Sequence, residues 1–227
     1  MRKRIKPIVV YVVLALLGLA LVIANIHNTS KQQAHLQNVK SAIPYATTPK
    51  TTTSSTSSSS DEELKLNPII DLSGWQLPQD IDYDVLSNHI SGAIVRVFGG
   101  SQISKDSNAA SSNGVDKSFK THIKELKKRD VPVAVYSYAQ GTSVKEMKEE
   151  ARIFYKNASP YKPTYYWIDV EEETMSNMEQ GVQAFLAELK RLGAEKVGLY
   201  IGAYFMLEQE VSTKNFDAVW IPAYGTD

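Results

Sequence analysis

The arrangement of apolar residues along the chain changes near residue 67, and two patterns alternate beyond it. Beyond this point, short runs rich in valine, isoleucine and tyrosine alternate with segments whose apolar residues recur every three or four positions. Such runs are typical of buried strands, and the second spacing is typical of helices that bury one face. The six runs lie at residues 68–73, 93–98, 133–138, 165–170, 197–201 and 218–221. Their alternation with helices predicts an α/β fold with a parallel sheet.

Residues that favour helix ends mark where three longer helices should begin. Asp116 can cap a helix that runs to Arg129. Ser143 and Ser176 are each followed three positions later by a glutamate, which is the capping-box pattern. The helix after Ser176 should end at Gly193. The residues expected to face the core are Phe119, Ile123, Leu126, Val144, Met147, Ala151, Phe154, Val182, Phe185, Leu186 and Leu189.

The segments that connect the runs help to distinguish a nucleotide-binding sheet from a barrel. Neither a Gly-x-Gly-x-x-Gly sequence nor a P-loop follows the first run, so a nucleotide-binding sheet would lack its phosphate-binding loop. We therefore predict a (β/α) barrel, or part of one. Shorter helical pieces at 81–88 and 204–210 fit between its strands. The long polar segment 101–115 suits a binding loop at the carboxyl end of a strand.

The N-terminal residues have the pattern of a membrane anchor. Residues 1–6 carry four basic side chains, and residues 7–26 are uncharged and mostly aliphatic. About 20 such residues suffice for a transmembrane helix, and basic residues before the span place the N-terminus inside. We expect a single-pass cell-membrane protein whose remainder is extracytoplasmic. The alternative is a signal peptide cleaved near Ala24, which would give a secreted protein.

Residues 27–66 are expected to connect this span to the globular domain, which we assign to residues 67–227. Threonine, serine, proline and alanine dominate residues 41–60. A segment of this composition cannot bury a core and is expected to be a disordered extracytoplasmic linker.

Composition excludes several classes of function. The chain has 25 basic and 25 acidic side chains, so no excess of positive charge favours nucleic acid as a partner. It has no cysteine, which excludes disulfides, thiolate metal sites and a cysteine nucleophile. No two of its four histidines have the spacing of metal ligands, and there is no Gly-x-Ser-x-Gly elbow. We expect neither a metal nor a cofactor.

The fourth run ends in a cluster of carboxylates. Asp169, Glu171, Glu172 and Glu173 fall within five residues, although a buried strand has no structural use for such a cluster. Side chains on a strand alternate between faces, so Asp169 and Glu171 point the same way, about 6.6 Å apart along the backbone. Parallel-sheet enzymes place their chemistry at the carboxyl ends of strands. Asp169 and Glu171 are therefore candidates for an acid/base pair, whereas Glu172 and Glu173 fit a solvated loop.

A barrel would bring further candidates to the same mouth. Asp71 lies near the end of the first run, and Tyr136, Tyr138 and Tyr200 lie on later ones. Carboxylates among aromatic rings suit a sugar, because rings stack on its apolar faces and carboxyl groups act on the glycosidic oxygen. Trp167, taken alone, is better explained as a core residue, and the tyrosine pair 136 and 138 fits either role.

Several of these segments resemble one known family. Asp71-Leu72-Ser73, followed by Trp75-Gln76, is similar to the opening of the family 25 glycoside hydrolases, the Chalaropsis-type lysozymes that cleave peptidoglycan. The Asp-x-Glu of the fourth run matches as well. The resemblance covers residues 67–227 and includes residues 93–96, 116–138, 167–171, 198–202 and 220–224.

The resemblance implies an N-acetylmuramidase on a modified TIM-like barrel that hydrolyses the β-1,4 bond between N-acetylmuramic acid and N-acetylglucosamine. Glu171 would be the general acid on the glycosidic oxygen. Asp169 would orient the substrate's N-acetyl group, which takes part in place of an enzyme nucleophile, and Asp71 would hold the sugar or assist that step. The substrate-binding residues would be Tyr136, Tyr138, Tyr200 and Trp220.

The chain departs from the family pattern at its end. Members continue past the strand at Trp220 to two further strands, one of which carries another acidic site residue, but this sequence ends at Asp227. The resemblance therefore implies a C-terminally incomplete barrel, with two exposed sheet edges.

Two other functions remain open on the residues. One is a non-catalytic, membrane-anchored peptidoglycan-binding domain, although such a domain would not need both Asp169 and Glu171. The other is a barrel glycosidase for a different polysaccharide. No residue pattern identifies a protein partner.

Overall fold

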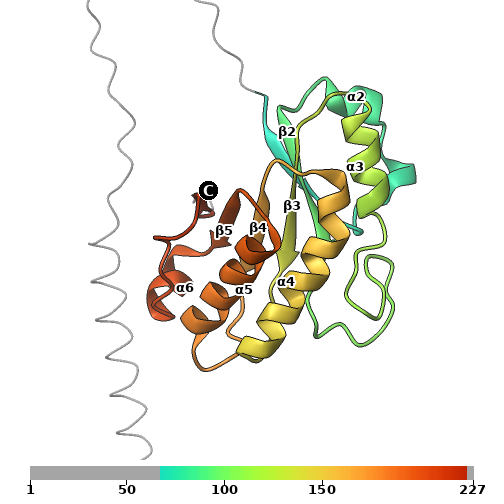
Figure 1. Ribbon diagram of the computed structural model, residues 1–227. Coiled ribbons are helices and arrows are strands. Elements are labelled where there is room, and N and C mark those ends of the chain that lie inside the picture. Colours follow the sequence, from blue (N-terminus) through green and yellow to red (C-terminus); the bar gives the residue numbers. More distant parts are fainter. Residues whose placement is uncertain (1–66, 224–227) are drawn as a thin grey trace, which may run out of the picture. The chain divides into compact units, whose positions relative to one another are not determined.

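The computed structural model describes residues 67–223, which form six parallel strands and the helices that connect them (Figure 1). Every strand pairs with the next one in the sequence, in the order β1-β2-β3-β4-β5-β6. This order confirms the predicted run of β/α units, and each strand lies within two residues of its predicted bounds. The strands are β1 (Ile69–Leu72), β2 (Gly92–Phe98), β3 (Val133–Tyr138), β4 (Tyr166–Val170), β5 (Val197–Ile201) and β6 (Ala218–Trp220).

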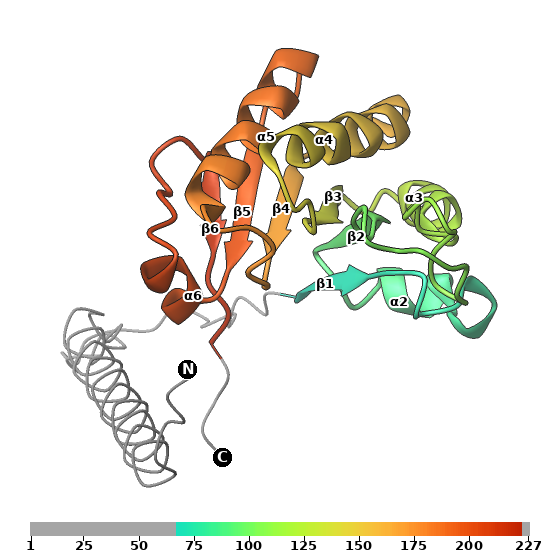
Figure 2. The same ribbon diagram turned by 90° about the horizontal axis from the view of Figure 1, so that it is seen from below.

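The helices lie between consecutive strands. The longer ones are α3 (Phe119–Lys127), α4 (Val144–Ala158) and α5 (Met178–Leu192), and the shorter ones are α2 (Tyr83–Ser87) and α6 (Ala203–Glu208). Two single turns of 3₁₀ helix span Pro78–Asp80 and Ser159–Tyr161. Viewed end-on, the strands form an arc, with α3, α4 and α5 on its outer side (Figure 2).

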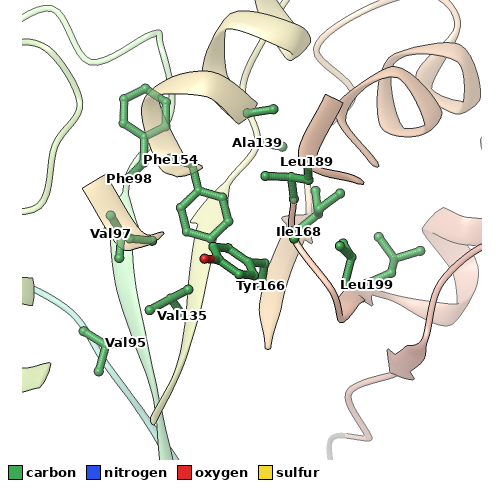
Figure 3. Packing of buried hydrophobic residues seen from close by; sticks show 14 of the residues in the cluster. Val95, Val97, Phe98, Val135, Ala139, Phe154, Tyr166, Ile168, Leu189 and Leu199 are labelled. Atoms are coloured by element: carbon green, nitrogen blue, oxygen red, sulfur yellow. The ribbon is translucent and has the colours of Figure 1, made fainter. Parts of the chain in front are cut away.

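The two faces of this arc carry different residues because side chains alternate along each strand. Positions on the outer face, such as Val95, Val135, Ile168 and Leu199, are fully buried. They form the main core with Phe154 and other apolar residues of the covering helices (Figure 3). The inner face is polar and aromatic instead. In strand order its residues include Asp71, Ile94, Arg96, Tyr136, Tyr138, Trp167, Asp169, Tyr200 and Trp220.

The helix starts agree with the predicted caps in one case and differ in two. The Ser143 hydroxyl accepts a hydrogen bond from the Glu146 N–H, as predicted. Ser176 is not the cap of α5, because Asn177, one residue later, accepts from the Gln180 N–H. Both residue types cap well, so the pattern alone could not separate them.

Asp116 acts on the start of α3 from outside the helix. Ser118 holds the cap position, and the Asp116 carboxylate accepts hydrogen bonds from the N–H groups of Ser118 and Phe119, at 2.8 and 3.1 Å. The predicted cap therefore stabilises the first turn, although the helix begins later than predicted.

Within residues 67–223 the sheet is open rather than closed into a barrel. Strand β1 pairs only with β2, and β6 pairs only with β5. The outer strands expose apolar side chains, among them Ile69 on β1 and Val219 on β6. The described part of the chain is thus a curled, six-stranded half-barrel of the TIM-like type.

The predicted transmembrane and linker segments lie outside the described residues. These segments are 1–6, 7–26 and 27–66. No helix between residues 67 and 223 combines the length and the apolar character that a membrane span requires. The expected anchor therefore stays a prediction.

Candidate active site

The three candidate carboxylates line one pocket on the inner face of the arc. Asp71 comes from β1, Asp169 from β4, and Glu171 follows the end of β4. The pocket encloses about 170 Å³, which is less than the ~300–1,000 Å³ of pockets that enclose a drug-sized ligand. A polymer would therefore rest across its mouth rather than lie inside it.

The curl of the sheet is what brings Asp71 to the acidic pair. Three inter-strand spacings separate β1 from β4, which would be about 14 Å in a flat sheet. Yet both carboxylates line the same pocket, and the negative charge of Asp71 contributes to raising the pKa of Asp169. Interaction of this kind requires the arc that the six strands form.

Asp169 is the most perturbed carboxyl group of the site. Only 8 % of the residue is exposed, and burial is the main cause that raises the pKa of Asp169 from 3.8 to about 8. The neighbouring Glu171 raises the pKa further, then Asp71, while the Arg96 guanidinium opposes them. Within the described protein, the Asp169 Oδ1 atom has no hydrogen-bond partner. The group thus holds a proton at neutral pH and keeps one oxygen unpaired.

Glu171 differs from Asp169 in its surroundings. It lies beyond the last residue of β4 and is exposed to solvent. The two carboxyl groups interact directly, by charge and through a hydrogen bond that raises the pKa of Asp169. One group is therefore fixed and buried, and its partner can reach a ligand in the pocket.

Four aromatic side chains form the wall of the pocket, namely those of Tyr136, Trp167, Tyr200 and Trp220. The Trp220 ring meets Tyr200 edge-on at 5.1 Å between centroids, and meets Trp167 edge-on at 6.2 Å. Trp167 is half-buried and faces the pocket, so its interpretation as a core residue was wrong.

Gly198 leaves the space that the Trp167 ring occupies. A Cβ atom at Gly198 would lie 2.4 Å from Cε3 of that ring. The two residues face each other on neighbouring strands, β5 and β4. The aromatic wall therefore depends on a residue that has no side chain.

Tyr138 is the one sequence-based candidate that does not line the pocket. It shares the inner face and pairs with Asp169 in the strand register. Its hydroxyl donates to Glu172 Oε1 at 2.8 Å. Burial, followed by this bond, raises the pKa of Tyr138. The structure thus places Tyr138 beside the pocket, engaged with an acid of the loop after β4.

The sequence-based reasoning missed two inner-face residues of β2. Ile94 lines the pocket, and Arg96 forms an ion pair with the buried Asp116, with Nε 3.0 Å from Oδ2. Both could have been found by extending the alternation argument to β2, since they alternate with Val95 and Val97 and the charge of Arg96 marks their face as the polar one.

The histidines in the described part of the chain serve structural contacts. His122 is buried against the Tyr83 hydroxyl and the Ser73 carbonyl, and His89 contacts the Val85 carbonyl. Among residues 67–223, no group of three or more histidine or carboxylate side chains is arranged to hold a metal ion.

Comparison with known proteins gives one family. The sequence model of the glycosyl hydrolases of family 25 matches residues 70–227. None of the curated protein sequences matches the chain.

The solved structures that are similar to this chain include the following two. A glycosyl hydrolase 25 of Streptococcus pneumoniae, described as the virulence factor GHIP, is 57% identical over 70% of this chain and 69% of its own, with a TM-score of 0.68. The catalytic domain of the endolysin ply40 from bacteriophage P40 of Listeria monocytogenes is 24% identical over 65% and 70% of the two chains, with a TM-score of 0.55. The second likeness supports the fold alone.

Proposed function

The chain belongs to the glycosyl hydrolases of family 25, and from this membership we propose that it is a lysozyme acting on peptidoglycan. The bond cleaved would be the β-1,4 linkage between N-acetylmuramic acid and N-acetylglucosamine. One observation carries the proposal: a buried carboxyl group with a raised pKa lies beside an exposed one, in a pocket walled by aromatic rings.

Glu171 would give the proton to the glycosidic oxygen. The Asp169–Glu171 pair interacts directly and retains a proton up to about pH 8, because burial and mutual repulsion oppose ionisation of Asp169. Glu171 is the member that is exposed at the pocket. Asp169 would keep the shared proton available, and Glu171 would deliver it to the leaving oxygen.

Asp169 would also position the substrate's N-acetyl group. Its Oδ1 atom is a buried acceptor without a partner in the described protein, and an unpaired buried acceptor carries a free-energy cost. The N–H of an N-acetyl group would remove this cost by donating to that oxygen. The acetyl carbonyl could then attack the anomeric carbon, so the protein itself would need no nucleophile.

Asp71 and the aromatic wall would hold the sugar. Asp71 lines the pocket from β1 and can accept hydrogen bonds from sugar hydroxyls. The rings of Tyr136, Tyr200 and Trp220 offer apolar faces to the sugar.

A pure binding domain explains the pocket less well. Aromatic rings and one ionised carboxylate suffice to bind a sugar, whereas an interacting acid pair destabilises the fold when both members ionise. Keeping such a pair has a use in proton transfer.

We further propose that the hydrolase domain works outside the cytoplasm. The proposal rests on the basic residues 1–6 and the apolar residues 7–26, which suit a signal-anchor, and on a substrate that lies outside the cell membrane. Protease treatment of intact cells should degrade residues 67–223, and a domain that resists until the cells are broken would contradict this location.

Hydrolysis of purified peptidoglycan tests the main proposal. The wild-type chain should clear a suspension and release new N-acetylmuramic acid reducing ends, while Glu171→Gln should bind the wall without clearing it. Clearing by Glu171→Gln would overturn the acid assignment. Binding by wild type without any clearing would favour the non-catalytic function, and reducing ends of another sugar would point to a different glycosidase.

A further inference from the structure

Trp75 lies in the turn that follows β1 and exposes 63 % of its surface. A single exposed apolar side chain needs no explanation by itself. What distinguishes Trp75 is the turn that displays it, Ser73–Gln76. Hydrogen bonds within the turn hold it together, and buried polar groups of other segments hold it in place.

The side chains on either side of Gly74 and Trp75 close the turn. The Gln76 N–H donates to the Ser73 carbonyl at 3.0 Å. The Gln76 Oε1 atom accepts from the Ser73 N–H at 2.9 Å and from the Ser73 hydroxyl at 3.1 Å. Both end residues are thus used within the turn, and Trp75 is the side chain that it presents outward.

A buried carboxylate fixes the turn to the rest of the fold. The Gly74 N–H donates to Asp116 Oδ2 at 2.7 Å. The same carboxylate pairs with Arg96 and accepts two N–H groups at the start of α3. Four donors therefore hold one buried group, which ties the turn to β2 and α3.

A buried histidine fixes the turn from a second direction. His122 Nε2 lies 3.1 Å from the Ser73 carbonyl oxygen, and Nδ1 lies 2.6 Å from the Tyr83 hydroxyl. A carbonyl only accepts, so Nε2 carries the hydrogen and Nδ1 accepts from the tyrosine. Burial lowers the pKa of His122, which keeps the ring in this neutral form.

Close packing leaves the turn no room to shift. A Cβ atom at Gly74 would lie 2.2 Å from the carbonyl oxygen of Ala109, in the long loop before α3. The backbone of the turn therefore lies directly against that loop. The indole of Trp75 stands on a rigid support although it is itself exposed.

Trp75 lies within a short distance of a residue that lines the pocket. It follows Asp71 by four residues, so the two Cα atoms are at most about 14 Å apart. Asp71 lines the pocket and lies near the carboxyl end of β1, the strand that the turn follows. A polymer that crosses the mouth of the pocket can therefore reach the indole within a few sugar units.

We propose that Trp75 is a stacking platform for an additional N-acetylhexosamine unit of the glycan strand, outside the pocket that holds the cleaved bond. The proposal rests on the proposed function. A flat indole matches the apolar face of a pyranose ring, and a support that is rigid before binding reduces the entropy lost when the strand binds.

Substrates of two lengths test the platform. On long glycan strands, Trp75→Ala should lower kcat/KM by about tenfold, which corresponds to ~1.4 kcal/mol, chiefly through a higher KM. On a short chromogenic disaccharide that fills only the pocket, it should match wild type. Trp75→Phe should recover most of the loss, since it keeps a flat ring. Val85→Ala, which removes another exposed apolar side chain (56 % exposed), is the matched control and should change neither substrate's kinetics.

The outcomes separate the platform from the proposed function. Equal kinetics of Trp75→Ala and wild type on both substrates would overturn the platform while the hydrolase stands. Equal losses on both substrates would assign Trp75 a structural role and also overturn it. Binding of long strands should be measured in the Glu171→Gln background as well. Binding that depends on Trp75, in a chain whose wild type does not hydrolyse, would retain the platform and reject the lysozyme.

Discussion

Replacing Asp169 by asparagine should stabilise the fold while it removes activity. The reason is the direction of the pKa shift. Asp169 has a pKa of about 8 in the folded chain and 3.8 as the ordinary value. The folded chain therefore binds a proton more tightly, and the stability linked to that proton is present below pH 3.8 and is lost as the pH rises through 8. Asparagine cannot ionise and avoids this loss.

The size of the effect follows from the shift. At pH 7 the wild-type carboxyl is about three pH units above its unfolded pKa, which at ~1.4 kcal/mol per unit gives an upper bound of about 4 kcal/mol. Against this, the buried asparagine amide would be left partly unpaired, which costs ~1–3 kcal/mol. We expect a net stabilisation of about 1–3 kcal/mol at pH 7.

Urea unfolding, followed by tryptophan fluorescence at intervals from pH 5 to pH 9, measures the difference. The stability of Asp169→Asn relative to wild type should grow with pH up to about 8 and then level off. Asp217→Asn is the matched control, because Lys190 lowers the pKa of Asp217. That variant should be destabilised by an amount that stays constant over this range. A pH-independent difference for Asp169→Asn, or a loss of stability that grows with pH, would refute the reasoning.

Three further predictions concern the same site and the start of α5. Hydrolysis by wild type should fall as the pH rises through about 8, because the Asp169 pair then loses its proton, and a pH–rate profile that stays flat to pH 9 would contradict this. Gly198→Ala should cost ~1–3 kcal/mol in urea unfolding and weaken hydrolysis, because its Cβ would collide with the Trp167 ring; unchanged stability would show that the ring moves freely. Asn177→Ala should destabilise the chain by ~1 kcal/mol in thermal unfolding, whereas Ser176→Ala should have little effect; the reverse order would make Ser176 the cap.

The strands could be predicted because their outer-face positions are buried without interruption. Val133 and Val135 on β3, for example, are both buried in the core. The alternation that identifies the strands also assigns their faces, so it suffices to place Asp169 and Glu171 on the same face.

Other features depended on contacts between distant parts of the chain. The turn after β1 is fixed by Asp116, which lies 42 residues from Gly74 in the sequence. The position of Tyr138 depends on Glu172, 34 residues away. The identity of a residue does not reveal which distant partner it will meet. Periodicity could therefore assign Tyr138 to the inner face, but it could not show that the side chain lies beside the pocket rather than in it.

The described half-barrel already contains the interacting carboxyl groups and the aromatic residues of the site. The charge of Asp71 on β1 acts on Asp169 on β4, and Tyr200 of β5 and Trp220 of β6 line the same pocket. The curl of the strands produces this arrangement, because a flat sheet would keep the two aspartates about 14 Å apart. Substitutions that flatten the arc should therefore lower the pKa of Asp169 without contacting its side chain. The pKa of that group, followed by carboxyl NMR or by the pH–stability difference, then reports on the curvature of the sheet.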